Sequence, residues 1–352
     1  MVDKSPLLHF LKGESAVDRL DAESFSLLLA EARACGLLGR VAHAITTSPT
    51  AHLLASHLQD QLMAANIHSS GFRQDVWREL AYIEKALSGL NTPVILLKGA
   101  SYVLLGLPAA DGRIFSDVDI LVTKEKMAHA EAALMLGGWS TGKLDDYDHR
   151  YYRQWSHEIP PMTHLRRGTT IDLHHSLVMP TCRIRVNSNR MVDAAVSEGG
   201  FWWRLQDSDM VLHAAVHFML NPEFDRGLRD LWDIDMLYRY FTKQAADFPE
   251  RLSARAKEVG LGEVIVQILG LTSSFFRTPL PFPSAPKSLF SHLAIRSAST
   301  RHPETRPFGQ GMTDTALMLR EMYLRLPNRL MVVHLWHKMS GLFSTQKKTK
   351  AG

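Results

Sequence analysis

The chain has 352 residues, of which 45% are hydrophobic and 22% charged, and its formal net charge at pH 7 is +4. This composition excludes a disordered or fibrous chain and provides enough apolar residues for one large domain or two smaller ones. Because basic and acidic residues nearly balance, a local basic surface is compatible with the sequence, but the charge does not require a nucleic-acid partner.

The cysteines and the terminal segment indicate the compartment. Cys35 and Cys182 are far apart and have no metal-binding spacing, which is typical of a protein in a reducing cytoplasm. The first fifteen residues lack the unbroken apolar stretch and the small-residue cleavage site of a secretion signal. No stretch contains the roughly 18 apolar residues that cross a bilayer. We therefore expect a cytoplasmic protein without stable membrane insertion.

Residues 1–90 are predicted to form an N-terminal helical region. Apolar residues recur at helical spacing between residues 20 and 32. Residues 51–89 fit one or two longer helices, which end near Gly89 and Asn91, and Pro93 then interrupts the pattern.

Residues 91–204 are predicted to form an α/β unit. The expected strands are residues 94–97, 117–122 and 169–175, with residues 151–159 as a further candidate. Helices are expected at residues 100–107 and 124–136, and the second helix is stopped by Gly137 and Gly138.

Residues 205–345 return to a helical pattern, and a polar tail covers residues 346–352. Helices are expected over residues 207–241 (interrupted at 221–222), 246–276 and 313–343, with a Pro-rich connector at 277–288. The predicted fold class is therefore α+β, with a small mixed sheet between N-terminal and C-terminal helical regions.

Two aspartates interrupt the apolar strand at residues 117–122. Residues two apart on a strand share a face, so Asp117 and Asp119 lie side by side while Val118 and Ile120 point toward apolar packing. Adjacent carboxylates repel unless a cation lies between them, and oxygen ligands of this kind suit Mg²⁺, or the similar Mn²⁺, together with substrate phosphates. Asp172 lies in another apolar strand and is the candidate third acid of a two-metal site.

Three segments of this unit resemble the nucleotidyltransferase superfamily, which has the DNA polymerase β-like fold. They are LLKGASYVLLG, RIFSDVDILV and IDLHHSL. More narrowly, they are similar to a bacterial family of uncharacterised nucleotidyltransferases, in which Leu-Lys-Gly replaces the usual Gly-Ser turn. The resemblance extends over about residues 25–245 and includes the segment HAAVHFMLNPEFDRGLRDLWDIDML.

The resemblance implies a role for each matching residue. Asp117 and Asp119 would bind Mg²⁺ and the nucleotide triphosphate, and Asp172 would ligate a second metal ion or accept a proton from the acceptor hydroxyl. The residues expected to contact the NTP, such as ATP, are Lys98, Gly99, Ala100, Arg113 and Ser116.

Several other residues have both a structural and a functional interpretation. His174 shares a strand face with Asp172, and the resemblance places Arg229 and Asp233 beside the nucleotide, although ion pairs on a helix surface explain them equally well. His213 and His217, spaced as in some zinc sites, lack an evident third ligand, which favours packing. The basic residues that bracket Asp172 fit an RNA or charged acceptor, or simply a basic surface: Arg150, Arg153, Arg166, Arg167, Arg183 and Arg185.

The leading hypothesis is a Mg²⁺-dependent enzyme that transfers a nucleoside monophosphate from an NTP to an acceptor hydroxyl and releases pyrophosphate. A small molecule or peptide is the preferred acceptor, and a tRNA, as in toxin-like relatives, is the alternative. A non-catalytic nucleotide-binding protein of the same fold is a second hypothesis. A metal-dependent phosphohydrolase of another fold would predict His-Asp pairs, but His129, His149 and His157 are not followed by aspartate.

Overall fold

The computed structural model describes residues 5–15, 17–143, 145–221, 224–281, 288–334 and 336–337. The polar tail predicted at residues 346–352 and the end of the helix predicted at 313–343 lie outside the described residues.

A seven-stranded mixed sheet forms the middle of the chain. Its strands are β1 (Val94–Leu96), β2 (Asp117–Leu121), β3 (Trp139–Thr141), β4 (Met162–His164), β5 (Thr170–His174), β6 (Val196–Ser197) and β7 (Trp202–Arg204). Their spatial order is β3-β4-β5-β2-β1-β7-β6. Central strand β2 is antiparallel to β1 and parallel to β5. The three predicted strands are therefore neighbours, and the α+β class is confirmed.

The strand predicted at residues 151–159 is wrong. Helix α7 (Asp146–Gln154) covers the first four residues of this segment, and Glu158 near its end forms only an isolated bridge with His174. The Asp145 carboxylate accepts a hydrogen bond from the Asp148 backbone N–H at 2.8 Å and caps the helix, whose first turn is acidic. Both features stabilise a helix N-terminus, and they outweigh the strand preference of the aromatic residues that follow.

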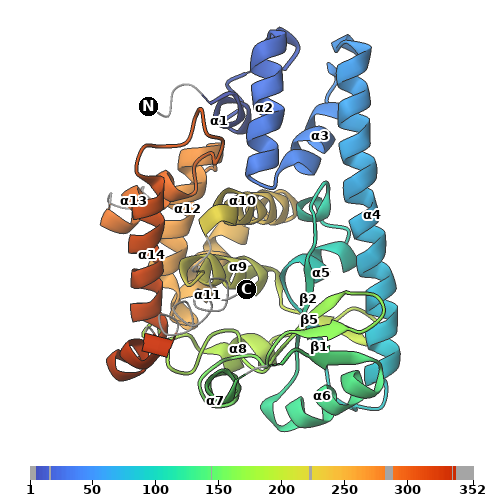
Figure 1. Cartoon of the computed structure of the whole chain (residues 1–352), viewed down its shortest axis with the longest axis vertical. Helices are drawn as coiled ribbons and strands as arrows, with labels where there is room; N and C mark the ends of the chain where they lie inside the picture. The colour runs from blue at the N-terminus through green and yellow to red at the C-terminus, as the bar shows by residue number, and fades with distance from the viewer. Residues whose placement is uncertain are drawn as a thin grey trace, which may run out of the picture.

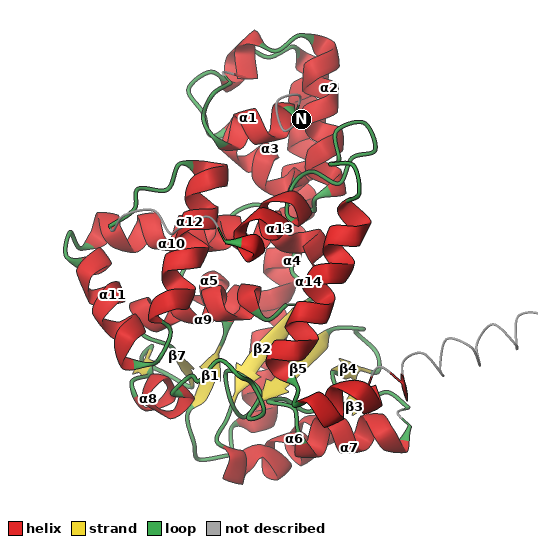
Figure 2. Cartoon of the chain, turned by 90° about the vertical axis from the view of Figure 1, so that its left-hand side faces the viewer, coloured by secondary structure: helices red, strands yellow, loops and turns green. Residues whose placement is uncertain are grey.

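Helices surround the sheet on both sides (Figures 1 and 2). The N-terminal region contains α1 (Pro6–Leu11), α2 (Ala22–Ala34), α3 (Leu38–Thr46) and the 32-residue α4 (Ser56–Leu87). Within the α/β unit, α6 (Met127–Leu136) covers one face of the sheet, and α5 (Lys98–Leu104) lies on the other.

The C-terminal region is helical, as predicted. It begins after α8 (Ser188–Asp193) and contains α9 (Asp207–Met219), α10 (Gly227–Gln244), α11 (Phe248–Glu258), α12 (Gly262–Phe276), α13 (Leu289–Ser297) and α14 (Gln310–Arg325). No helix in the described ranges is both long and apolar enough to cross a membrane.

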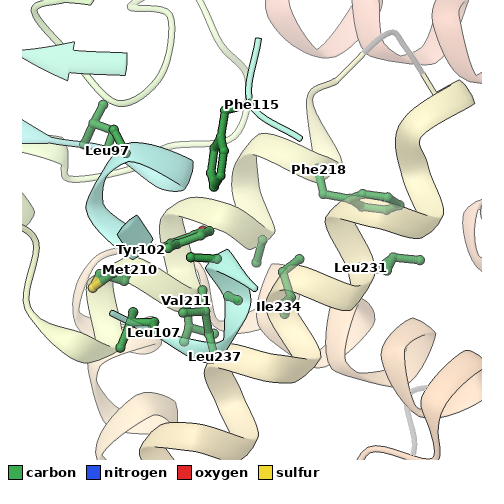
Figure 3. Close-up of a cluster of buried hydrophobic side chains, with 14 of the residues drawn as sticks. Leu97, Tyr102, Leu107, Phe115, Met210, Val211, Phe218, Leu231, Ile234 and Leu237 are labelled. Carbon is green, nitrogen blue, oxygen red and sulfur yellow. The ribbon is translucent and has the colours of Figure 1, made fainter. Parts of the chain in front are cut away.

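Apolar side chains join the sheet unit to the C-terminal helices near the acids of β2. Figure 3 shows Tyr102 of α5 and Phe115, just before β2, in the same cluster as Val211 of α9 and Ile234 of α10. All four are buried. Burial of such side chains contributes about 1.5–3 kcal/mol each. This packing fixes α9 and α10 over the sheet face that carries the acids.

Candidate active site

Asp117, Asp119 and Asp172 lie on one face of the sheet and line one cavity of about 260 Å³. Asp119 of β2 is in register with Asp172 of β5, and Asp117 is two residues before Asp119 on the same strand face. Neighbouring strands are about 4.8 Å apart, so the three acids are adjacent. The strand register therefore brings Asp172 next to Asp117 and Asp119, as expected.

Asp119 is the acid with cationic partners. Its Oδ1 accepts hydrogen bonds from Lys98 Nζ at 3.0 Å and from His174 Nε2 at 3.1 Å. Burial alone would raise the pKa of Asp119, but the Lys98 charge and the His174 hydrogen bond together hold this pKa well below its usual value. Asp119 is therefore ionised and fixed in place.

Asp117 and Asp172 have the opposite electrostatic environment. Burial, reinforced by the charge of Asp119, raises the pKa of Asp172 to about 7, and the same two causes raise the pKa of Asp117. Asp172 Oδ1 is buried without a hydrogen-bond partner. An unpartnered carboxylate oxygen among other carboxylates is unfavourable, and a bound cation would remove both problems.

The Leu-Lys-Gly turn positions Lys98 at the cavity. Lys98 has a φ of +43°, in the left-handed region that non-glycine residues rarely adopt, and it begins α5. Gly99 and Ala100 are buried within α5. A Cβ on Gly99 would lie 2.5 Å from Arg113 Nη1 and 2.9 Å from Phe115 Cδ1. Gly99 thus makes room for Arg113, a role that the sequence did not suggest.

Arg113 belongs to a buried ion network with Asp233. Arg113 Nε donates to Asp233 Oδ2 at 3.1 Å, and Arg40 of α3 donates from Nη2 to Oδ1 of the same carboxylate. The guanidinium of Arg113 also lies over the Phe115 ring, 4.9 Å from its centroid. Both Arg113 and Asp233 line the cavity. The network connects the N-terminal helices, the loop before β2 and α10.

Three more arginines line the same cavity: Arg226, Arg229 and Arg325. Arg229 is paired with Asp230, with its Nη2 2.7 Å from Oδ1. Ser116, which is exposed, completes the cavity edge beside Asp117. A cavity that combines carboxylates with guanidinium groups fits a metal–polyphosphate ligand, because the carboxylates can bind the metal and the guanidinium groups can bind the phosphates.

The basic residues that bracket Asp172 in sequence do not converge on the cavity. Arg153 pairs with Glu131 at 2.5 Å, and Arg167 binds Glu79 through two hydrogen bonds of 2.9 and 3.0 Å. Arg183 donates to Asn328 at 2.5 Å. These arginines are engaged at separate places on the molecule, which favours the surface interpretation.

His174, His213 and His217 gather near Asp119, but they differ in environment. His174 bonds Asp119, His217 lines the cavity, and His213 is buried beside it on α9. Burial, with Lys98 as the next cause, lowers the pKa of His213 to about 3 and that of His217 well below its usual value. Both are therefore neutral at pH 7, and no group of three metal-binding side chains among the described residues includes either of them.

The sequence analysis did not predict several residues of the cavity wall, among them His157, Glu158, Arg226 and Arg325. Arg325 is distant in sequence and had no recognisable signal. The adjacent pair His157-Glu158 did have one, because consecutive residues with metal-binding side chains are a recognisable local pattern.

The acids fit Mg²⁺, because all three offer carboxylate oxygens to the same cavity and one of these oxygens has no partner in the protein.

Comparison with known proteins identifies the family. No curated protein and no solved structure matches the chain. A family model described as "Uncharacterised nucleotidyltransferase" matches residues 21–277, which include the sheet, the three acids and the helices that carry the cavity arginines Arg226 and Arg229. The chain therefore belongs to the uncharacterised nucleotidyltransferase family.

Proposed function

We propose that the protein transfers a nucleoside monophosphate from an NTP to an acceptor hydroxyl in a Mg²⁺-dependent reaction that releases pyrophosphate. Family membership implies a nucleotide substrate in general. The observation that carries the finer proposal is the meeting of Asp117, Asp119 and Asp172 in one cavity with Lys98 and four arginines, Arg113, Arg226, Arg229 and Arg325.

The chain's own groups have distinct tasks in this proposal. Asp117, Asp119 and Asp172 would hold Mg²⁺, which supplies charge stabilisation for the entering and leaving oxygens. Lys98 holds Asp119 ionised and in position. Arg226, Arg229 and Arg325, which line the same cavity, neutralise the triphosphate and bind the pyrophosphate as it separates. If Asp172 does not ligate the ion, its pKa of about 7 suits it to accept the proton of the acceptor hydroxyl instead.

A small molecule or an exposed hydroxyl of a peptide is the acceptor that the cavity supports best. The cationic groups are gathered inside a cavity of about 260 Å³, between β2, β5, α9 and α10. Outside it, Arg153, Arg167 and Arg183 are engaged by Glu131, Glu79 and Asn328. A continuous basic track, which would favour RNA as acceptor, has no support from these contacts.

A thermal-shift panel of the four NTPs, with and without Mg²⁺, tests nucleotide binding, and mass spectrometry of candidate acceptors incubated with the preferred NTP tests transfer. A ligand that binds only the native state raises stability by RT ln(1 + [L]/Kd). We expect one or more NTPs to raise the melting temperature only when Mg²⁺ is present.

The matched variants are Asp117→Asn and Asp146→Asn. Asp117→Asn removes one carboxylate of the cavity and should abolish both the Mg²⁺-dependent shift and transfer. Asp146 lies in the first turn of α7, away from the cavity wall, and its variant should behave as the wild type. A Mg²⁺-dependent shift of equal size in the Asp117→Asn variant would refute the assignment of the metal site. Nucleotide binding without any transfer would favour the non-catalytic alternative.

A further inference from the structure

A second group of possible metal ligands lies next to the three acids. His157, Glu158 and His174 each offer one ligand atom, and these atoms lie within 4.8 Å of one another. His157 and Glu158 line the cavity, and His174 is buried behind them. The group differs chemically from the Mg²⁺ site because it supplies two imidazoles and a single carboxylate.

Backbone pairing brings these residues together. The Ile159 N–H donates to the Leu173 carbonyl at 3.0 Å, and the His175 N–H donates to the His157 carbonyl at 2.9 Å. Glu158 and His174 form an antiparallel β-bridge between these two bonds. Residues directly opposite each other in such a pair share a face. Backbone hydrogen bonds therefore place Glu158 beside His174, whatever rotamers the two side chains adopt.

The histidine ring nitrogens are oriented as in a metal site. His174 Nε2 bonds Asp119 Oδ1 at 3.1 Å, which leaves Nδ1 on the side of Glu158. Metal-binding histidines commonly donate their second ring N–H to a carboxylate, which fixes the tautomer and makes the other nitrogen a ligand. His174 Nδ1 and Glu158 Oε2 are 3.3 Å apart but lack hydrogen-bond geometry, so this ring nitrogen is buried without a partner. On His157, the nitrogen that lies near Glu158 is Nε2.

The separations fit one small ion. Two ligands at about 2.0–2.1 Å from a tetrahedral ion lie about 3.3 Å from each other. The Nδ1 of His174 and Oε2 of Glu158 have this separation, and His157 Nε2 is 3.8 Å from the same oxygen. Two histidines and one glutamate form a known zinc ligand set, and imidazole favours zinc-like ions over Mg²⁺.

We propose that His157, Glu158 and His174 form a binding site for a transition-metal ion of the Zn²⁺ class, distinct from the three-aspartate site. Because His157 and Glu158 line the cavity, the remaining coordination position faces it and is open to water or to an oxygen of the acceptor. The ion would also hold His174, and through it Asp119, in a fixed orientation. This proposal does not depend on nucleotidyl transfer.

A purely ionic arrangement is the competing explanation. A protonated His174 between Asp119 and Glu158 would account for the same two contacts without any ion. In that case Glu158 would affect Asp119 only through His174, and the protein would not bind transition metals at this site.

Cobalt titration of the full-length, chelator-treated protein separates the two explanations. Co²⁺ substitutes for Zn²⁺, and tetrahedral Co²⁺ has a much stronger visible absorption than Co²⁺ bound octahedrally by oxygen ligands. We expect an intense band that saturates at one Co²⁺ per chain, disappears when one equivalent of Zn²⁺ is added and persists in a large excess of Mg²⁺. Glu158→Gln and His157→Gln should each weaken Co²⁺ binding by at least about tenfold.

Three control variants locate the ion. His175→Gln changes the next histidine of the chain and should leave the band intact. The pair Asp145→Asn/Asp148→Asn removes the acids of an exposed Asp145–Asp148–His337 group and should also leave it intact. Asp117→Asn tests whether Co²⁺ occupies the three-aspartate site instead.

The proposal is overturned if no saturating band appears, if Glu158→Gln and His157→Gln bind Co²⁺ as tightly as the wild type, or if only the Asp117 or Asp145/Asp148 variants lose the band. Circular dichroism in the presence of chelator shows whether each variant is folded, and Glu158→Asp, which keeps a carboxylate, replaces any variant that is not. Failure of nucleotidyl transfer would not affect these absorption measurements, so the two proposals are tested separately.

Discussion

Asp119 and Asp172 lie opposite each other on the parallel strands β2 and β5, but their side chains have different electrostatic environments. Lys98 and His174 both bond Asp119, whereas Oδ1 of Asp172 is buried without a hydrogen-bond partner. The protein thus holds one ionised acid beside a second acid that accepts a proton at neutral pH. The positive charge around these two carboxylates is too small to balance both of them when ionised. A bound divalent cation would supply the additional positive charge.

Binding of Mg²⁺ should therefore strengthen as the pH rises through neutrality. The pKa of Asp172 is raised from 3.8 to about 7 in the folded protein. The free energy of unfolding of the metal-free protein therefore falls as the pH rises from about 3.8 to about 7, because the carboxyl group ionises more easily in the unfolded chain. Bound Mg²⁺ should offset this loss of stability. Below pH 7 the cation must displace a proton, so its affinity should fall about tenfold per pH unit.

The measurement is the Mg²⁺-induced rise in melting temperature at pH 6 and pH 8. We expect a larger rise at pH 8. Asp172→Asn, which cannot ionise, should weaken Mg²⁺ binding and remove most of the difference between the two pH values. A rise that is equal at both pH values in the wild type would show that Asp172 does not bind the cation.

The acids could be predicted from sequence because their signal is local and repeated. Asp117 and Asp119 interrupt a strand that is otherwise apolar, and Asp172 does the same in a second strand. Alternation fixes the face of each residue without knowledge of the rest of the fold. The pairing of Asp119 with Asp172 then follows from the neighbouring positions of β2 and β5.

The remaining cavity residues and the outer strands had no comparable signal. Strands β3, β4, β6 and β7 have two or three residues each, which is too short for alternation to be recognised. Arg325 reaches the cavity from α14 only through tertiary packing. Gly99 was expected to contact phosphate, but its packing against Arg113 depends on the loop before β2, which has no periodic pattern.

Replacing Gly99 by alanine should destabilise the protein and weaken nucleotide binding. The new Cβ would lie 2.5 Å from Arg113 Nη1, so Arg113 must move away from its position beside Asp233. Overpacking of this kind costs about 1–3 kcal/mol. Gly71→Ala is the control: it lies within α4 with nothing within 4 Å of the new Cβ, and it should stabilise the protein by about 0.5–1 kcal/mol. Urea denaturation measures both, and equal effects of the two variants would contradict the close packing at Gly99.

Loss of the Asp233 charge should be among the most damaging single changes in the chain. Arg40 and Arg113 both bond this carboxylate, and all three side chains are buried. Asp233→Asn would leave two buried guanidinium groups without their counter-charge, which typically costs about 3–5 kcal/mol.

The control for this variant is Asp75→Asn, which breaks the exposed pair of Asp75 with Arg78 and should change the free energy of unfolding by less than about 1 kcal/mol. Chemical denaturation measures the difference between the two variants. A small effect of Asp233→Asn would mean that water reaches this network and solvates the arginines.

The cavity arginines should determine nucleotide affinity. Arg226 and Arg325 line the same cavity as the three acids. Hydrogen bonds to charged groups contribute about 1.5–3 kcal/mol, so Arg226→Gln or Arg325→Gln should weaken binding of the Mg²⁺–NTP complex by about 10-fold to 100-fold. Arg153→Gln, which alters an ion pair with Glu131 outside the cavity, should leave the affinity unchanged. Calorimetric titration gives each constant, and a loss with Arg153→Gln that equals the loss with Arg226→Gln would place the triphosphate elsewhere.

Binding of RNA should be weak, since the arginines near Asp172 in sequence do not form one surface. Arg153 and Arg167 are held by Glu131 and Glu79, whereas Arg150 and Arg166 are exposed. If the acceptor were RNA, affinity for bulk tRNA would fall with rising salt, by a slope of about 0.7–0.9 in log–log terms for each phosphate contact. We expect little binding at moderate salt and the same result for Arg150→Ala/Arg166→Ala. Filter binding at low and moderate salt measures both proteins. Tight, salt-sensitive binding of tRNA that the double variant loses would instead identify RNA as the acceptor.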